Sequence, residues 1–186
     1  MPRRSWLLIA CAAGLAGCGL EAVPDAPGGL RGRLTAVVDG DTVRVDVNGR
    51  RESVRLLGID TPESGRPDTP VQCGALEATG SLRRLLGDED GGGPAVVLLA
   101  DPGQDRRDRF GRLLAYVELL SGTDLGAAQV RAGWARPYVY GRRPFARLAL
   151  YERAQREARR AGRGVHRSCG GRFDAPASRL RRRGRR

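Results

Sequence analysis

The chain contains no lysine and only one histidine. All 33 of its basic residues are arginine, and they give the 186 residues a formal net charge of +12. We attribute the missing lysine to genome composition, so it excludes no function. The single histidine, His166, argues against a zinc site built from several histidines, and we expect it to be packed or solvent-facing.

Long apolar runs are also missing, which leaves no clear membrane span. Residues 6–16 are apolar and follow Arg3-Arg4, but the run is too short to cross a bilayer and is typical of a secretion signal. It ends in Leu-Ala-Gly-Cys18, which resembles the bacterial lipobox and implies cleavage before Cys18 and lipidation of its sulfur. A plain signal peptide with an unmodified Cys18 is the alternative. We therefore predict an exported protein, lipid-anchored on the outer side of a bacterial membrane.

Cysteine is scarce as well, with four residues in the chain. Cys11 would leave with the signal and Cys18 would carry lipid, so Cys73 and Cys169 remain. An even pair in an exported chain favours a disulfide. Such a bond would close a long loop and stabilise the fold by roughly 4 to 5 kcal/mol in the chain-entropy model.

The most informative stretch is residues 38–63, which predicts a β-hairpin flanked by acidic residues. Residues 42–47 alternate as a half-buried strand does, Asn48-Gly49 suits a tight turn, and residues 54–57 form the returning strand. Asp41 would begin one strand and Asp60 would follow the other, so the carboxylates would converge. Two close carboxylates favour a cation between them, and hard oxygen ligands select Ca²⁺ or Mg²⁺. An ordinary turn at residues 39–41 is the alternative.

Arg55 and Glu63 flank this acidic pair in the sequence. Arg55 lies in an apolar strand, where an inward charge would need an anionic partner, and an outward orientation is equally compatible. Glu63 follows Asp60-Thr61-Pro62, and the proline-stiffened turn would hold it near the metal.

The remaining elements are read from periodicity. We expect strands at residues 30–38, 95–99 and 112–117, and helices at residues 71–86, 125–131 and 145–160. The last helix is amphipathic, with Leu148, Tyr151 and Ala154 facing inward and its arginines outward. The order is three strands, a helix, two strands and two helices.

Together these pieces resemble the thermonuclease (staphylococcal-nuclease-like) family. The resemblance covers residues 30–169 and rests on DGDT (39–42), RLLGIDTPE (55–63) and DRFGRLLAYV (108–117). It implies a mainly β fold, a five-stranded Greek-key barrel of the OB-fold type with three α-helices. It also implies a calcium-dependent endonuclease that hydrolyses DNA and RNA, prefers single strands and leaves 3′-phosphate ends.

The same resemblance implies roles for individual residues. Asp41, Asp60 and the Thr61 carbonyl would bind Ca²⁺, and Glu63 would act as general base or position the water. Arg55 and Arg112 would clamp the phosphate, whose extra negative charge they favour. Substrate binding would fall to Arg109, Tyr138 and Tyr140, with packing as the alternative for the two tyrosines.

The predicted organisation has four parts: a signal at residues 1–17, a tether at 18–29, the barrel domain at 30–171 and a basic, disordered tail at 172–186. We expect a monomer whose partners are DNA, RNA and, through Cys18, a membrane. The competing function is a non-catalytic OB-fold nucleic-acid-binding lipoprotein. Val165-His166 departs from the Leu-Trp pair of many relatives and puts the local packing there in question.

Overall fold

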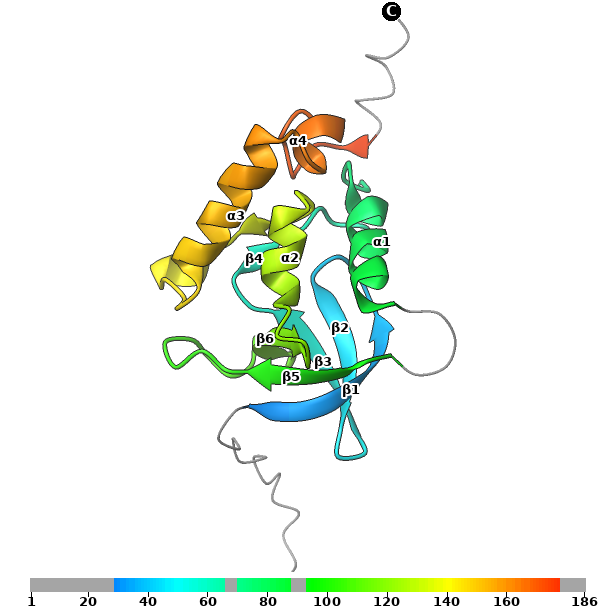
Figure 1. Cartoon of the computed structure of the whole chain (residues 1–186), viewed down its shortest axis with the longest axis vertical. Helices are drawn as coiled ribbons and strands as arrows, with labels where there is room; N and C mark the ends of the chain where they lie inside the picture. Colours follow the sequence, from blue (N-terminus) through cyan, green and yellow to red (C-terminus); the bar gives the residue numbers. More distant parts are fainter. Residues whose placement is uncertain (1–28, 66–69, 88–92, 178–186) are drawn as a thin grey trace, which may run out of the picture.

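Five strands close into a barrel in the computed structural model, which describes residues 29–65, 70–87 and 93–177 (Figure 1). Around the barrel the order is β1-β2-β3-β6-β5, and β5 pairs back onto β1. Every pairing is antiparallel except that of β3 with β6. The predicted five-stranded barrel is confirmed. The strands are β1 Leu30–Val37, β2 Thr42–Val47, β3 Arg50–Leu56, β5 Ala95–Leu99 and β6 Leu113–Leu119.

Alternation along the strands decides which side chains fill the barrel. In β2 the valines at 43, 45 and 47 are buried while Arg44 between them is exposed. The turn to β3 places Asn48 and Gly49 at positive φ (53° and 80°), and Gly49 N donates to Asp46 Oδ1 at 2.8 Å. The sequence signals for this hairpin are therefore confirmed.

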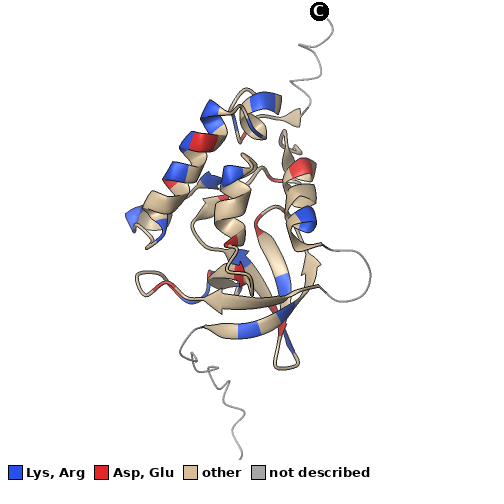
Figure 2. Cartoon of the chain, viewed as in Figure 1, with Lys and Arg blue, Asp and Glu red and all other residues tan. Residues whose placement is uncertain are grey.

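Three main helices cover the barrel, as predicted: α1 Ala75–Leu86, α2 Leu125–Arg131 and α3 Leu148–Arg160. α2 begins at the N-cap Asp124, which accepts from Ala127 N at 3.0 Å. α3 buries Tyr151 and Ala154 and exposes its arginines, which Figure 2 shows along its length. Leu148 is half-buried.

Two helices begin later than predicted. α1 begins at Ala75 rather than residue 71, because Gly74 has a left-handed φ of 89° and Cys73 N bonds Ala175 O instead of a helical partner. α3 begins at Leu148 rather than residue 145, because the buried Phe145 packs into the core ahead of the helix.

Several short elements were not predicted. β4 Ile59–Asp60 pairs with β7 Arg136–Pro137, a 3₁₀ turn η1 spans Tyr140–Arg142, and α4 spans Val165–Ser168. Two residues are too few to show a period, so periodicity could not reveal β4 or β7. Their pairing fixes the position of Asp60.

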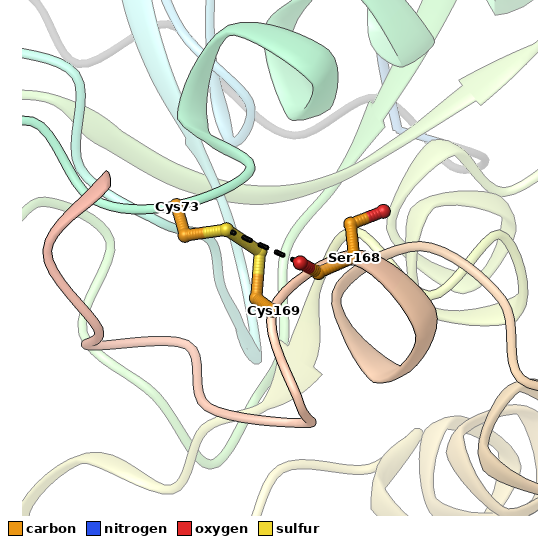
Figure 3. The surroundings of a disulfide bond; sticks show 3 residues. All are labelled: Cys73, Ser168 and Cys169. Carbon is orange, nitrogen blue, oxygen red and sulfur yellow. Dashed lines mark hydrogen bonds between the residues drawn. A yellow bond between two sulfur atoms is a disulfide. The ribbon is translucent and has the colours of Figure 1, made fainter. Parts of the chain in front are cut away.

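The predicted disulfide between Cys73 and Cys169 is present, with 5.9 Å between the Cα atoms and a sequence separation of 96 (Figure 3). Cys169 belongs to a small buried cluster with Val165 and Phe173. His166 packs edge-on against Phe173, and burial, aided by the nearby Arg159, lowers its pKa. Of the two roles expected for His166, packed or solvent-facing, the structure shows the packed one.

Some predicted segments lie outside the described residues: the signal, Cys18, all of the tether but Gly29, and tail residues 178–186. Residues 172–177 are described and belong to the folded body, since Phe173 is buried and Ala177 N donates to Val71 O at 2.9 Å. The folded part therefore includes residues 172–177, which were predicted to belong to the tail. No helix in the described ranges has the length and apolar character needed to cross a membrane.

Candidate active site

Asp41 and Asp60 converge at one end of the barrel, as their places beside adjoining strands predicted. Asp41 precedes β2 and is 6% exposed; its Oδ2 accepts from Thr61 N at 3.1 Å and Thr61 Oγ1 at 2.9 Å. Asp60 ends β4. Both carboxylates face Arg55, whose Nη2 lies 3.0 Å from Asp41 Oδ2 and 3.7 Å from Asp60 Oδ1.

Arg55 therefore points into the site, which decides between its two predicted orientations. Its Nη1 donates to the carbonyls of Leu56 at 3.1 Å and Ile59 at 2.9 Å. The guanidinium is thus held by main-chain oxygens on one side and by carboxylates on the other. Its side chain is 16% exposed, so this charge is largely withdrawn from water.

The carboxyl group of Asp41 is buried and lies close to a second acidic residue. Burial raises its pKa to about 7, against the opposing effect of Arg55, and the neighbouring Asp39 raises it further. Asp39 itself accepts from Asp41 N through Oδ1 at 3.0 Å. A divalent cation beside Asp41 would favour the charged form of this buried carboxylate.

The donor set suits a hard divalent cation that keeps water and substrate ligands. Within the described ranges, no group of three or more His, Cys, Asp and Glu side chains could hold a metal ion. Asp41 and Asp60 offer two carboxylates, and the buried Thr61 lies against Asp41. A site with these two carboxylates leaves positions for carbonyl, water and phosphate oxygens, which Ca²⁺ and Mg²⁺ accept.

Arg112 is oriented by Asp108 in the loop before β6. The Nε and Nη2 atoms of Arg112 each lie 2.7 Å from Asp108 Oδ2, while Oδ1 accepts from Phe110 N and Arg112 N. Burial would raise the pKa of Asp108, but these hydrogen bonds lower it. Arg112 Nη1 lies 3.4 Å from Oγ1 of Thr42, whose hydroxyl donates to Asp41. The second arginine thus reaches the acidic end of the barrel.

Glu63 is half-buried at the edge of the same site. Its backbone N donates to Gln72 Oε1 at 2.7 Å, and its carbonyl accepts from Gln72 N at 2.9 Å. These two hydrogen bonds hold the backbone in place where the turn through Pro62 ends.

A pocket of about 870 Å³ brings these groups together. The residues predicted to act in catalysis, metal binding and substrate binding all line it except Thr61, which donates two hydrogen bonds to Asp41. Tyr138 and Tyr140 are 46% and 63% exposed, which favours ligand contact over packing for both rings. The predicted residues in the pocket wall are Asp41, Arg55, Asp60, Glu63, Arg109, Arg112, Tyr138 and Tyr140.

Four residues that contact the predicted site residues were not themselves predicted. Phe110 is 68% exposed in the pocket, with Arg109 and Arg112 over its ring at 4.7 and 5.4 Å. Arg136 holds Asp60 Oδ2 through Nε at 3.0 Å and Nη2 at 2.9 Å. The spacing of Asp108 and Arg112 could have suggested their pair. No local signal joins Arg136 to Asp60 or Gln72 to Glu63. The four are Gln72, Asp108, Phe110 and Arg136.

Comparison with known proteins agrees with this geometry. The family model for staphylococcal nuclease homologues matches residues 53–167. The chain is 35% identical to a thermonuclease of Staphylococcus hyicus over 133 residues, which cover 69% of this chain and 70% of the relative. It is 37% identical to a thermonuclease of Staphylococcus intermedius over 125 residues, 67% of this chain and 68% of the relative. Endonuclease YncB of Bacillus subtilis (strain 168) is 38% identical over 108 residues, 58% of this chain and 48% of that protein.

Proposed function

Because this chain belongs to the family of staphylococcal nuclease homologues and is a nuclease, we propose that its activity depends on calcium. It cuts single-stranded DNA and RNA in preference to duplexes, with little sequence specificity, and leaves 3′-phosphate ends. The observation that carries this assignment is the pocket itself. Two carboxylates, a separate glutamate and two arginines line the same pocket as exposed aromatic rings. The arginines can bind a phosphodiester, the carboxylates a cation, and the aromatic rings a base.

Asp41, Asp60 and the Thr61 carbonyl would hold the ion. When bound, Ca²⁺ would neutralise negative charge on the phosphate. In the structure the guanidinium of Arg55 lies between the two carboxylates. The buried Asp41 carboxylate, which faces Arg55 with Asp60, supports a cation at this point, because a bound cation favours the charged form of a buried carboxylate.

The chain's own residues supply orientation and proton transfer. Arg55 and Arg112 bind the non-bridging phosphate oxygens and stabilise the charge that grows on them during attack. Glu63 accepts a proton from the attacking water. The water oxygen bonds to phosphorus in line with the 5′ oxygen, which leaves with the electron pair of the broken P–O bond and takes a proton from solvent water, so the products are a 3′-phosphate and a 5′-hydroxyl. Tyr138, Tyr140 and Arg109 hold the flanking base and phosphate.

Metal removal tests the calcium dependence. The purified chain is incubated with heat-denatured DNA, duplex DNA or RNA, in Ca²⁺, in Mg²⁺ or in a calcium chelator. We expect cleavage with Ca²⁺ only, faster on denatured DNA, with products that polynucleotide kinase labels directly at the 5′-hydroxyl. Cleavage in chelator would contradict the calcium requirement, and binding without cleavage in every condition would contradict the nuclease.

We also propose that the protein is exported and anchored by lipid at Cys18, and that it is a monomer. The motif before Cys18 supports the anchor. Membrane fractions of cells that express the full chain should contain it, and Cys18→Ala should release it. Equal recovery of both proteins in the soluble fraction would argue against the anchor.

A further inference from the structure

Glu63 is held by its main chain rather than by its position in a strand. Its N–H and C=O are both bonded to Gln72, at 2.7 Å through the Gln72 side chain and at 2.9 Å through the Gln72 backbone. This reciprocal pair fixes the peptide groups on both sides of the Glu63 Cα. Gln72 therefore fixes the position of the Glu63 Cα, from which the carboxylate side chain extends.

Gln72 is itself held by the end of the folded chain. Residues 71–73 pair with residues 175–177: Gln72 forms a bridge with Pro176, Cys73 N donates to Ala175 O at 2.7 Å, and Ala177 N donates to Val71 O at 2.9 Å. The disulfide joins Cys73 to the buried Cys169. In Figure 3 a dashed line connects the Cys73 sulfur with the carbonyl oxygen of Ser168, 3.8 Å away. Residues 71–73 are thus joined to the C-terminal segment, residues 169–177, by backbone hydrogen bonds and by the disulfide.

We propose that Gln72 is a positioning residue for Glu63, and that the C-terminal segment with its disulfide keeps Gln72 in place and so sets the turnover of the site. This role rests on the proposed function, because Glu63 is the general base there. A base must stay within hydrogen-bond reach of its proton, and a shift of about 1 Å is enough to cost up to ~100-fold in rate.

This arrangement separates turnover from substrate binding. Gln72 does not line the pocket, whereas the arginines that bind phosphate do. Arg55 and Arg112 are oriented by Asp41 and Asp108, which do not depend on Gln72. Loss of the Gln72 acceptor should therefore lower kcat and leave KM nearly unchanged.

Two substitutions at one position test the acceptor. Gln72→Met keeps the length of the side chain and removes the oxygen, while Gln72→Glu keeps an oxygen acceptor. On a fluorophore-quencher single-stranded DNA oligonucleotide with Ca²⁺, we expect Gln72→Met to lower kcat by about 10- to 100-fold with KM within about twofold. Gln72→Glu should recover most of the rate. Glu77→Gln on the exposed face of α1 is the matched control. Wild-type kcat in Gln72→Met, or equal loss in both Gln72 variants, would overturn the role of the acceptor.

Hydrogen exchange gives a readout that does not need catalysis. The Glu63 amide should exchange about tenfold or more faster in Gln72→Met, and also in a Cys73→Ser/Cys169→Ser chain, whose kcat should fall in the same direction. Unchanged exchange at Glu63 in both proteins would overturn the positioning role. If the wild-type chain cleaves nothing, but the Glu63 amide still exchanges faster in the variants, the proposed function is wrong and the positioning of Glu63 by Gln72 stands.

Discussion

The groups that act on the phosphate are each oriented by a neighbour. Asp108 binds the guanidinium of Arg112 from one side, main-chain carbonyls hold Arg55, and Gln72 holds the backbone of Glu63. Long side chains lose rotamer freedom when they are fixed in this way, so less of that freedom is lost when substrate binds.

Glu63→Gln removes the proton acceptor and keeps the size of the side chain. We expect kcat to fall by about 10²- to 10⁴-fold, while binding of labelled single-stranded DNA, measured by fluorescence anisotropy with Ca²⁺, changes little. Arg55 and Arg112 remain in place to bind phosphate. An unchanged turnover would remove Glu63 from the mechanism.

Asp108→Asn weakens the hold on Arg112. The amide keeps one oxygen but loses the charge that pairs with Nε and Nη2. We expect kcat/KM on single-stranded DNA to fall by about tenfold or more, since a charge-assisted pair becomes a neutral one. Asp174→Asn, at an exposed position, is the control. Equal activity in the two variants would show that Asp108 has no influence on Arg112.

At the scale of elements, a sheet of two short strands, each of two residues, carries a site residue. β4 and β7 align Asp60 with Arg136, and Tyr138 N donates to Gly58 O at 2.9 Å. Gly58 has a φ of 78°, and a Cβ there would lie 2.6 Å from the Phe145 ring. Glycine is therefore required between β3 and β4.

Gly58→Ala should disturb both the fold and the site. The left-handed backbone and the clash with Phe145 should lower the free energy of unfolding by about 1 to 3 kcal/mol, and the shift of β4 should lower activity. Gly80→Ala, in α1 with its nearest contact at 3.4 Å, should instead stabilise by about 0.5 to 1 kcal/mol. Urea unfolding measures both. The same sign for the two variants would contradict this difference.

Asp101 connects the end of β5 with β6 and the start of α3. It accepts hydrogen bonds from the Tyr116 hydroxyl, from Ala146 N at 2.7 Å and from Gly103 N at 2.8 Å. Burial would raise its pKa, but these bonds lower it below the ordinary 3.8. The ionised carboxylate thus stabilises the fold above about pH 4, and this contribution is lost as the pH falls through the lowered pKa.

Asp101→Asn should therefore cost about 1.5 to 3 kcal/mol of unfolding free energy at pH 7. The difference from wild type should shrink below pH 4, where the Asp101 carboxyl of the unfolded wild-type chain begins to bind a proton while that of the folded chain is still ionised. Urea unfolding at pH 7 and at pH 3 measures this, with Asp174→Asn as the exposed control. A difference that stays constant with pH would exclude the ionised group as the cause.

At the scale of the whole molecule, the disulfide closes the fold. It joins the segment before α1 to the segment after α4 across 96 positions. Most of the domain lies inside this loop, so the bond restricts the unfolded chain strongly.

Reduction should lower the free energy of unfolding by about 4 to 5 kcal/mol in the chain-entropy model. Urea unfolding with and without reductant measures this change. The Cys73→Ser/Cys169→Ser chain should be as unstable as the reduced protein and should not respond to reductant. A wild-type protein that is equally stable in both conditions would contradict a stabilising disulfide.

The sequence determined most of the architecture and the chemistry. The five barrel strands and three helices have local periodicity, because each buries one face in a common core. The acidic residues and arginines lie in contiguous motifs, and the cysteines could be paired by elimination.

Only the tertiary structure decided how the reactive groups are held. Three contacts illustrate this: Arg55 with Asp41, Arg136 with Asp60, and Gln72 with Glu63. Each joins two segments of the chain, and the residue pattern of one segment does not predict which segment it will contact. A polar side chain at the end of a strand or in a turn satisfies its hydrogen bonds with whatever group folding brings near it. The physical reason is that such contacts depend on the closure of the barrel and on the path of the chain over it, and these are properties of the folded molecule.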